Sequence, residues 1–247
     1  MVKSKFWNIV NEVIYNSDVV LEVLDARLID DTRNVDIENK IKQLNKKLIH
    51  VVNKIDLVDI ETIKEKLKEL TNPVFISSIQ RLGTTILKRK ILQIGKKDKI
   101  VVGVVGYPNT GKSSVINILC GRKKARTSST SGTTRGIQKI RSSDRLMFLD
   151  TPGVIPFEDK DVVKHALIGS MNVQSLKEPD LIAMHLIEKL NGKVEQHYKV
   201  ERCSDSEETL ERIALKINRL KKGGIPDTMS TAKTIIMDWQ RGRIKNY

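Results

Sequence analysis

The sequence is poor in cysteine, in aromatic residues and in long apolar runs. Its 247 residues include two cysteines, and phenylalanine, tryptophan and tyrosine together make up 4%. Cys120 and Cys203 lie too far apart to form a metal knuckle, and they suggest no disulfide framework. No apolar run approaches the length of a membrane span, and Glu12 and Asp18 interrupt the start of the chain, unlike a signal peptide. We therefore expect a soluble protein of the reducing cytoplasm that binds no membrane.

Acidic residues are too few to balance the basic ones. Lysine and arginine number 44 and aspartate and glutamate 30, which gives a net charge of +14. This excess favours a polyanionic partner such as a nucleic acid, with merely solvated surface lysines as the alternative. The sequence contains no RRM, KH or zinc pattern, so any RNA contact is predicted from charge and not from a base-reading motif.

One glycine-containing stretch carries the clearest chemistry. Gly106-Tyr-Pro-Asn-Thr-Gly-Lys-Ser113 follows a β-branched run and matches the phosphate-loop pattern G-x-x-x-x-G-K-[ST]. Its glycines let successive backbone N–H groups point at phosphate oxygens, Lys112 supplies a positive charge, and Ser113 offers a hydroxyl to Mg²⁺. The following helix turns its positive dipole end toward the anion. We predict that a nucleoside triphosphate is bound by Asn109, Thr110, Gly111, Lys112, Ser113 and Ser114.

Strand-like and helix-like segments alternate over the first 157 residues. Strands are predicted directly before the phosphate loop and at Val19–Leu24, Lys47–Val52, Pro73–Ile76, Ile137–Arg141 and Arg145–Leu149. Helices are predicted at 4–16, 34–46, 60–70, 84–95 and 112–121. The alternation predicts an α/β fold with a mostly parallel six-stranded sheet, flanked by helices, with ligand loops at the carboxyl ends of the strands.

From about Phe157 the strand-like runs disappear. Helical patterns follow at Val162–Leu176, Asp180–Leu190, Ser206–Leu220 and Thr231–Arg241. We therefore predict two domains, an α/β domain at 1–158 and a smaller all-α domain at 159–247. The second is expected to present basic faces through Lys189, Lys193, Lys199, Arg202, Arg212, Lys216, Arg219, Lys221 and Lys222.

Two further motifs are typical of guanine nucleotide chemistry. In Asn53-Lys-Ile-Asp56, the Asp56 carboxylate can accept hydrogen bonds from N1–H and the exocyclic amine of guanine, which adenine does not offer. Asn53 and Lys54 would brace this loop and cover the ring. Alone the motif is a weak signal, but beside a phosphate loop it is strong. Asp150-Thr-Pro-Gly153 supplies a carboxylate for the water shell of Mg²⁺ and a glycine N–H for the γ-phosphate.

Two shorter segments complete the predicted site. Gly132-Thr-Thr-Arg135 resembles a first switch, whose threonine closes on Mg²⁺ and the γ-phosphate; Thr134 is favoured and Thr133 stays open. Ser77-Ser78 resembles a loop whose backbone supports the guanine oxygen, although a solvated loop is its default interpretation. The predicted Mg²⁺ ligands are Ser113, Thr134 and Asp150, and the predicted catalytic residues are Lys112, Asn109, Thr134 and Gly153.

The order of these motifs is unusual. Ordinary GTPases carry the phosphate loop, first switch, DTPG, NKxD and serine loop in that order, whereas here the last two come first. With Asp25-Ala-Arg27 ahead of NKID, the chain closely resembles the circularly permuted GTPases of the YlqF (HSR1/MMR1) type, which act in ribosome assembly. The resemblance covers residues 1 to about 157 and continues more weakly into Thr231–Ile244.

The resemblance implies a function. It implies a permuted P-loop GTPase domain that hydrolyses GTP to GDP, and a helical domain that docks on ribosomal RNA or on a pre-ribosomal large subunit. We expect a monomer. The alternative is a GTP-gated RNA-binding module that acts on tRNA, another RNA or a signalling complex, with hydrolysis incidental. A metabolic kinase is disfavoured, because NKID and DTPG would then serve no purpose.

Two positions bear on how hydrolysis proceeds. Val154 follows DTPG where Ras-like enzymes carry the glutamine that orients water, so water positioning cannot rest on that side chain. Asn109 resembles the asparagine with which some GTPases hold a potassium ion, together with carbonyls of the first switch. Such an ion would stabilise the charge that develops on phosphate release. The alternative is that Asn109 only braces the loop.

Overall fold

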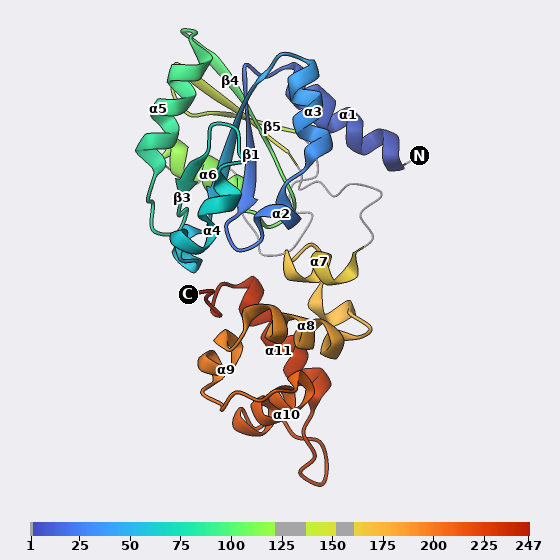
Figure 1. The fold of residues 1–247 in the computed structure, drawn as a ribbon. Coiled ribbons are helices and arrows are strands. Elements are labelled where there is room, and N and C mark those ends of the chain that lie inside the picture. Colours follow the sequence, from blue (N-terminus) through green and yellow to red (C-terminus); the bar gives the residue numbers. More distant parts are fainter. Residues whose placement is uncertain (1, 122–136, 152–160) are drawn as a thin grey trace. The chain divides into compact units, whose positions relative to one another are not determined.

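The structure is a computed structural model that describes residues 2–121, 137–151 and 161–247. The chain divides into two compact units, Met1–Lys160 and Asp161–Tyr247, which we call unit 1 and unit 2 (Figure 1). Within the described ranges, no helix is both long enough and apolar enough to cross a membrane. Cys120 and Cys203 are free thiols.

The described part of unit 1 contains one six-stranded sheet. Its strands run in the spatial order β3-β2-β1-β4-β6-β5. All neighbours pair in parallel except β5, which is antiparallel to β6. The predicted mostly parallel α/β sheet is therefore confirmed. The strands are β1 (Val19–Asp25), β2 (Lys47–Asn53), β3 (Val74–Ile76), β4 (Ile100–Val105), β5 (Gln138–Arg141) and β6 (Leu146–Asp150).

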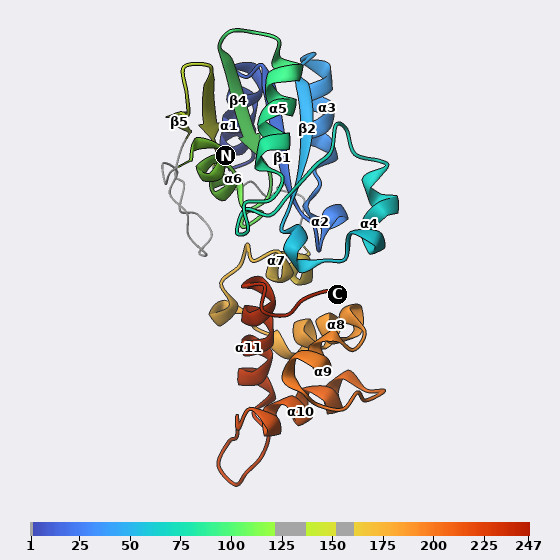
Figure 2. The ribbon, with the colours of Figure 1, turned by 90° about the vertical axis from the view of Figure 1, so that its left-hand side faces the viewer.

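Helices cover both faces of the sheet (Figures 1 and 2). Side chains of α5 and α6 pack with Leu21 and Val104 in one apolar cluster, and side chains of α1 and α3 pack with Val20 in a second. Because both faces are covered, every residue of β1 is buried. The helices of unit 1 are α1 (Val2–Tyr15), α2 (Ile29–Thr32), α3 (Val35–Gln43), the 3₁₀ turn Ile55–Leu57, α4 (Ile60–Leu67), α5 (Thr84–Gly95) and α6 (Lys112–Cys120).

The carboxyl ends of the five parallel strands lie at one edge of the sheet. Parallel strands align their ends irrespective of sequence order, so β1 lies beside β4 although β2 and β3 come between them in the chain. Motifs that are far apart in sequence therefore meet at this edge. The residues at the strand ends are Asp25, Asn53, Ser77, Gly106 and Asp150.

Unit 2 is helical, and α8 and α11 form its centre. Leu186 of α8 and Ile235 of α11 are fully buried. Between α10 and α11 the chain forms a narrow loop that extends away from the helices (Figures 1 and 2). The elements are α7 (Val162–Leu167), the 3₁₀ turn Val173–Ser175, α8 (Pro179–Leu190), α9 (Lys193–Tyr198), α10 (Ser206–Lys216) and α11 (Thr228–Gln240).

The predicted single helix over Val162–Leu176 is wrong. The helix ends at Leu167, because Gly169 takes a left-handed conformation (φ 76°) and the Ser170 N–H bonds back to the His165 carbonyl. The short helices α2 and α9 were not predicted, since four to six residues are too few to show a helical period.

Candidate nucleotide-binding site

The phosphate loop joins β4 to α6 and has the backbone that the motif requires. Gly106 and Gly111 have φ values of 139° and 100°, which residues with a side chain rarely adopt. A Cβ on Gly106 would lie 2.6 Å from the Val23 carbonyl oxygen, and one on Gly111 would lie 2.2 Å from Asn53 Nδ2. Neither glycine can be replaced without moving a neighbouring strand or the NKID motif.

Lys112 lies inside this loop. Its Nζ donates to the carbonyl oxygens of Gly106 (3.0 Å) and Tyr107 (2.7 Å), so the side chain curls back over the loop that precedes it. Burial lowers the pKa of Lys112 to about 8, and the charge of Asp150 only partly opposes this. A buried ammonium held by carbonyl dipoles is suited to a phosphate, because an anion would restore its preference for the charged form.

Ser113 and Asp150 form the metal-binding end of the site. Ser113 Oγ donates to Asp150 Oδ2 at 2.9 Å, while the other carboxylate oxygen, Oδ1, is buried without a partner in the described part of the chain. Burial raises the pKa of Asp150. Two hard oxygen donors beside an unpaired carboxylate oxygen fit Mg²⁺, which takes one or two protein oxygens and keeps several waters. Ser113 and Asp150 would hold the ion.

Thr151, the second residue of DTPG, was not assigned a role from sequence. It is buried, and its hydroxyl donates to the Val104 carbonyl of the neighbouring strand β4 at 2.8 Å. This bond ties the end of β6 to the strand that carries the phosphate loop. Asp150 is thereby held beside Ser113.

The NKID segment leaves β2 and enters a 3₁₀ turn, Ile55–Leu57. Within the described ranges, Asp56 Oδ1 is buried and has no hydrogen-bond partner. An ionised carboxylate can only accept, and a buried acceptor left unpaired costs about 1–3 kcal/mol. The two donors on the edge of guanine would satisfy it.

Asn53 connects the guanine motif to the other loops. Its Nδ2 donates to the Thr110 carbonyl at 2.8 Å, and its Oδ1 accepts from the Ser78 N–H at 3.1 Å. One buried side chain therefore joins the phosphate loop, the NKID loop and the serine loop.

Asp25 holds Lys54, a role that sequence reasoning missed. Its Oδ2 accepts from Lys54 Nζ and from Arg27 Nη2, each at 2.7 Å, and its Oδ1 accepts from Arg27 Nε at 3.0 Å. Burial alone would raise the pKa of Asp25, but the two cations outweigh it and hold that pKa far below its usual range. Asp25 and Asn53 are register partners at the ends of β1 and β2. The acidic residue at the end of the first strand was the feature of the sequence that could have predicted this role.

The remaining predicted residues of these loops also lie at this edge. Ser77 is buried and accepts from the Gln80 N–H, and Thr110 is buried and donates to the Tyr107 carbonyl. Asn109 has a left-handed backbone (φ 59°), and Ser114 lies in the first turn of α6.

Four predicted positions lie outside the described residues. They are Thr133, Thr134, Gly153 and Val154. Their roles at the first switch and after Asp150 therefore stay predictions.

The chain is similar to known GTP-binding proteins. The family described as 50S ribosome-binding GTPase (MMR_HSR1) matches residues 101–221. An uncharacterised GTP-binding protein of Methanocaldococcus jannaschii is 42% identical over 249 residues, covering 97% of this chain and 66% of that protein. Nucleolar GTP-binding protein 2 of Yarrowia lipolytica is 37% identical over 253 residues and that of Saccharomyces cerevisiae 36%, with 97% of this chain and 50% and 52% of those proteins covered.

The chain contains a GTPase domain of the MMR_HSR1 family, and its motifs stand in permuted order. Its fold is similar to that of YlqF from T. maritima in the GNP-bound form, with a TM-score of 0.67 at 24% identity, over 98% of this chain and 96% of that one. The chain spans about two thirds of the M. jannaschii relative and about half of the yeast relatives it matches.

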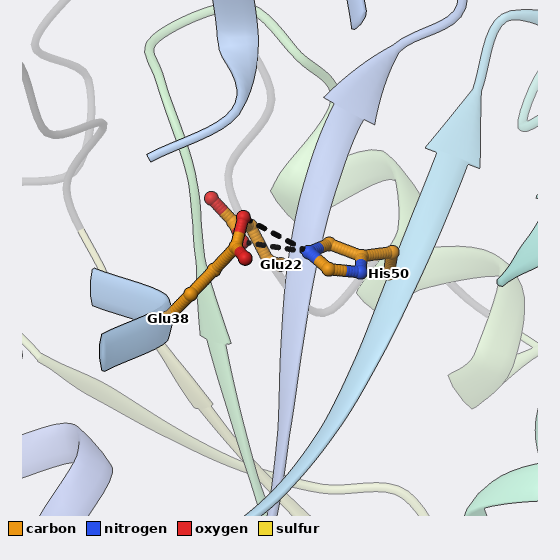
Figure 3. Close-up of side chains that lie close together, drawn as sticks. All are labelled: Glu22, Glu38 and His50. Atoms are coloured by element: carbon orange, nitrogen blue, oxygen red, sulfur yellow. Dashed lines mark hydrogen bonds and ion pairs between the residues drawn. The ribbon is translucent and has the colours of Figure 1, made fainter. Parts of the chain in front are cut away.

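Unit 1 also contains a polar cluster on the α3 face of the sheet, which the sequence did not suggest. Figure 3 shows the Glu22 and Glu38 carboxylates and the His50 ring pointing toward one another. His50 Nε2 lies 3.2 Å from Glu22 Oε2 and 3.3 Å from Glu38 Oε1. Glu22 and His50 are register partners on β1 and β2, which explains their meeting. Glu38 is also paired with Arg33.

The cluster has the composition of a metal site but not the proton arrangement. His50 Nδ1 accepts from the Thr71 N–H at 2.8 Å, so the ring proton is on Nε2, the atom that faces both carboxylates. A metal-binding histidine uses a deprotonated nitrogen and donates from the other one. In this geometry the Nε2–H group itself satisfies the two carboxylates, and the cluster does not fit a metal ion.

Proposed function

We propose that this protein binds GTP with Mg²⁺, hydrolyses it to GDP and phosphate, and serves as a switch in ribosome assembly, acting on the large subunit. Two buried carboxylate oxygens without a partner in the described chain support the nucleotide part. One is Asp56 Oδ1, in the guanine motif. The other is Asp150 Oδ1, on the carboxylate that accepts from the Ser113 hydroxyl.

The chemistry follows from the site. Lys112, the loop N–H groups and the dipole of α6 stabilise the charge on the phosphates. The bound Mg²⁺, held by Ser113 and Asp150 and by Thr134 of the first switch, would neutralise charge on the β- and γ-oxygens. The Gly153 N–H would contact the γ-phosphate, so the first switch and the DTPG segment would both respond to its loss.

The Asp56→Asn variant tests guanine recognition. An asparagine amide cannot accept from both N1–H and the amine of guanine, but it can donate to the carbonyl that xanthine carries in place of the amine. GDP affinity should fall by about a hundredfold or more, and xanthosine diphosphate affinity should rise. Titration with labelled nucleotides measures both.

Asp59→Asn is the matched control. Asp59 is exposed three residues later and caps α4 by accepting from the Glu61 N–H, a role that asparagine also fills. Unchanged GDP binding by Asp56→Asn would overturn the assignment of the base site.

The ribosomal part rests on the family and on charge. The matching family is described as 50S ribosome-binding, the yeast relatives are named nucleolar, and this chain carries a net charge of +14. Sedimentation with a non-hydrolysable GTP analogue should place the protein with large-subunit particles and not with small ones. Migration with neither, together with binding to tRNA, would favour the alternative of a GTP-gated RNA-binding module.

The proposal includes a potassium ion at Asn109. Asn109 has a left-handed backbone, which asparagine tolerates, and it lies in the phosphate loop. Replacing potassium by sodium at equal ionic strength should slow GTP turnover, and equal rates would remove the ion from the mechanism. The monomeric state and the cytoplasmic location stay predictions.

A further inference from the structure

Between α10 and α11, every residue from 218 to 225 is exposed, and we call this segment the basic loop. Figures 1 and 2 show it extending from the helices of unit 2. Its conformation is fixed by backbone hydrogen bonds within the loop. Lys221 N–H donates to the Ile225 carbonyl at 2.8 Å, and Gly224 N–H donates to the Lys221 carbonyl at 3.2 Å. The base is closed by a bridge between Leu220 and Pro226.

The charge of the basic loop is uncompensated. Arg219, Lys221 and Lys222 carry three positive charges, and no acidic residue occurs between Glu211 and Asp227. None of these three cations forms an ion pair with the described residues. Arg212, by contrast, is paired with Glu208 at 2.7 Å on α10. The loop therefore carries only positive charges, whereas α10 carries three acidic and two basic residues.

The end of the loop presents bare backbone. Gly223 and Gly224 have φ values of 84° and 77°, and a Cβ on either would meet nothing within 4 Å. Glycine is therefore required at both positions by the turn conformation and not by packing within the chain. Because neither residue has a side chain, another molecule can come close to the backbone there.

Two large apolar side chains of the basic loop are also exposed. Leu220 and Ile225 have relative exposures of 41% and 61%. Apolar groups beside unpaired cations suit a nucleic acid, which presents sugar and base faces next to its phosphates.

We propose that the basic loop contacts the phosphodiester backbone of RNA, an inference that rests on the ribosomal function proposed above. Lys221 and Lys222 would pair with successive phosphates, the glycine backbone would allow the strand to approach, and Leu220 and Ile225 would lie against sugar and base faces. Because the hairpin is already ordered by its own hydrogen bonds, little loop entropy is lost on binding.

The test removes the two lysines from the 247-residue chain. The Lys221→Ala/Lys222→Ala variant is compared with Lys42→Ala/Lys47→Ala, which removes two exposed lysines of unit 1 that also lack an ion pair with described residues. Both variants have the same net charge. Binding to a labelled RNA stem-loop is measured by anisotropy over a range of salt, with labelled GDP as a second ligand and anionic phospholipid vesicles as a third.

The proposal predicts that the loop variant binds the stem-loop about tenfold more weakly and that its slope of log Kd against log salt falls by about 1.5, the loss of two phosphate contacts. The control and the GDP affinity of both variants should stay as in the unmodified protein. Equal RNA binding by both variants would overturn the loop assignment alone. No RNA or subunit binding by the unmodified protein would overturn the ribosomal proposal as well. Binding of the loop to vesicles and not to RNA would assign it to membranes and overturn the proposal.

Discussion

At the residue scale, we expect Lys112 to couple nucleotide binding to proton uptake. Its pKa is lowered to about 8 by burial, so a substantial fraction of the free protein carries a neutral lysine near that pH. A phosphate beside Nζ favours the charged form, so binding must draw a proton from solution. At pH near 8 we expect an uptake of about half a proton per GDP, falling as the pH is lowered.

Calorimetry in buffers of different ionisation enthalpy measures this proton uptake. The Lys112→Arg variant is the control, because a guanidinium stays protonated and its binding should release or take up no proton from this position. An uptake that is the same in both proteins would exclude Lys112 as its source.

His50 lies between the fully buried Glu22 and the partly buried Glu38. His50→Leu removes the ring donor that faces both carboxylates, and breaking such an arrangement costs about 3–5 kcal/mol of unfolding free energy. Burial raises the pKa of Glu22, because the interior disfavours its charged form, and the loss of a donor adds to that cost.

Urea unfolding followed by circular dichroism measures this loss. Adding Glu22→Gln to His50→Leu removes the fully buried carboxylate and leaves Glu38 paired with Arg33, so it should restore most of the loss. A loss that Glu22→Gln does not reduce would mean that the ring acts by packing alone.

At the scale of elements, α11 terminates α7. Trp239 is buried and its Nε1 donates to the Leu167 carbonyl at 3.0 Å, while Gln240 Nε2 donates to the Ala166 carbonyl at 2.7 Å. Both carbonyls belong to the last turn of α7, and the Ala166 carbonyl also accepts from the Gly169 N–H at 3.1 Å. Side chains that are distant in sequence therefore stabilise the end of α7 at Leu167, whereas the apolar periodicity predicted a helix that continues to Leu176.

Trp239→Phe tests this helix end. It removes the donor and leaves unfilled volume, so we expect a loss of about 2–3 kcal/mol in unfolding free energy and faster hydrogen exchange in α7. The neighbouring exposed Arg241, changed to alanine, should leave both quantities nearly unaltered. Unchanged exchange in α7 with Trp239→Phe would show that the helix end is fixed by Gly169 by itself.

At the scale of the whole molecule, nucleotide binding should raise the free energy of unfolding. GDP with Mg²⁺ at about a hundred times its Kd adds about 2.7 kcal/mol to the folded state, which corresponds to a rise of about 5–10 °C in Tm for a chain of this size. Asp150→Asn should reduce the contribution of Mg²⁺ to this shift. Differential scanning fluorimetry measures it, with ADP as the control ligand. An equal shift with ADP would contradict guanine specificity.

The sequence alone determined the nucleotide motifs and the α/β class. The phosphate loop is contiguous and its chemistry is built from neighbouring N–H groups, Lys112 and Ser113, so residue order is sufficient to predict it. The alternation of apolar strands with amphipathic helices likewise reflects local periods, and it predicted six strands and their mostly parallel pairing.

Only the tertiary structure decided what depends on strand register and on distant packing. Asp25 meets Lys54, and Glu22 meets His50, because β1 and β2 pair in one particular register. The exposed basic loop likewise depends on where α10 ends and α11 begins. From the sequence alone, the same lysines could equally lie on the solvated face of a helix. Periodicity reports which residues are buried, whereas pairing between strands decides which buried charges lie together.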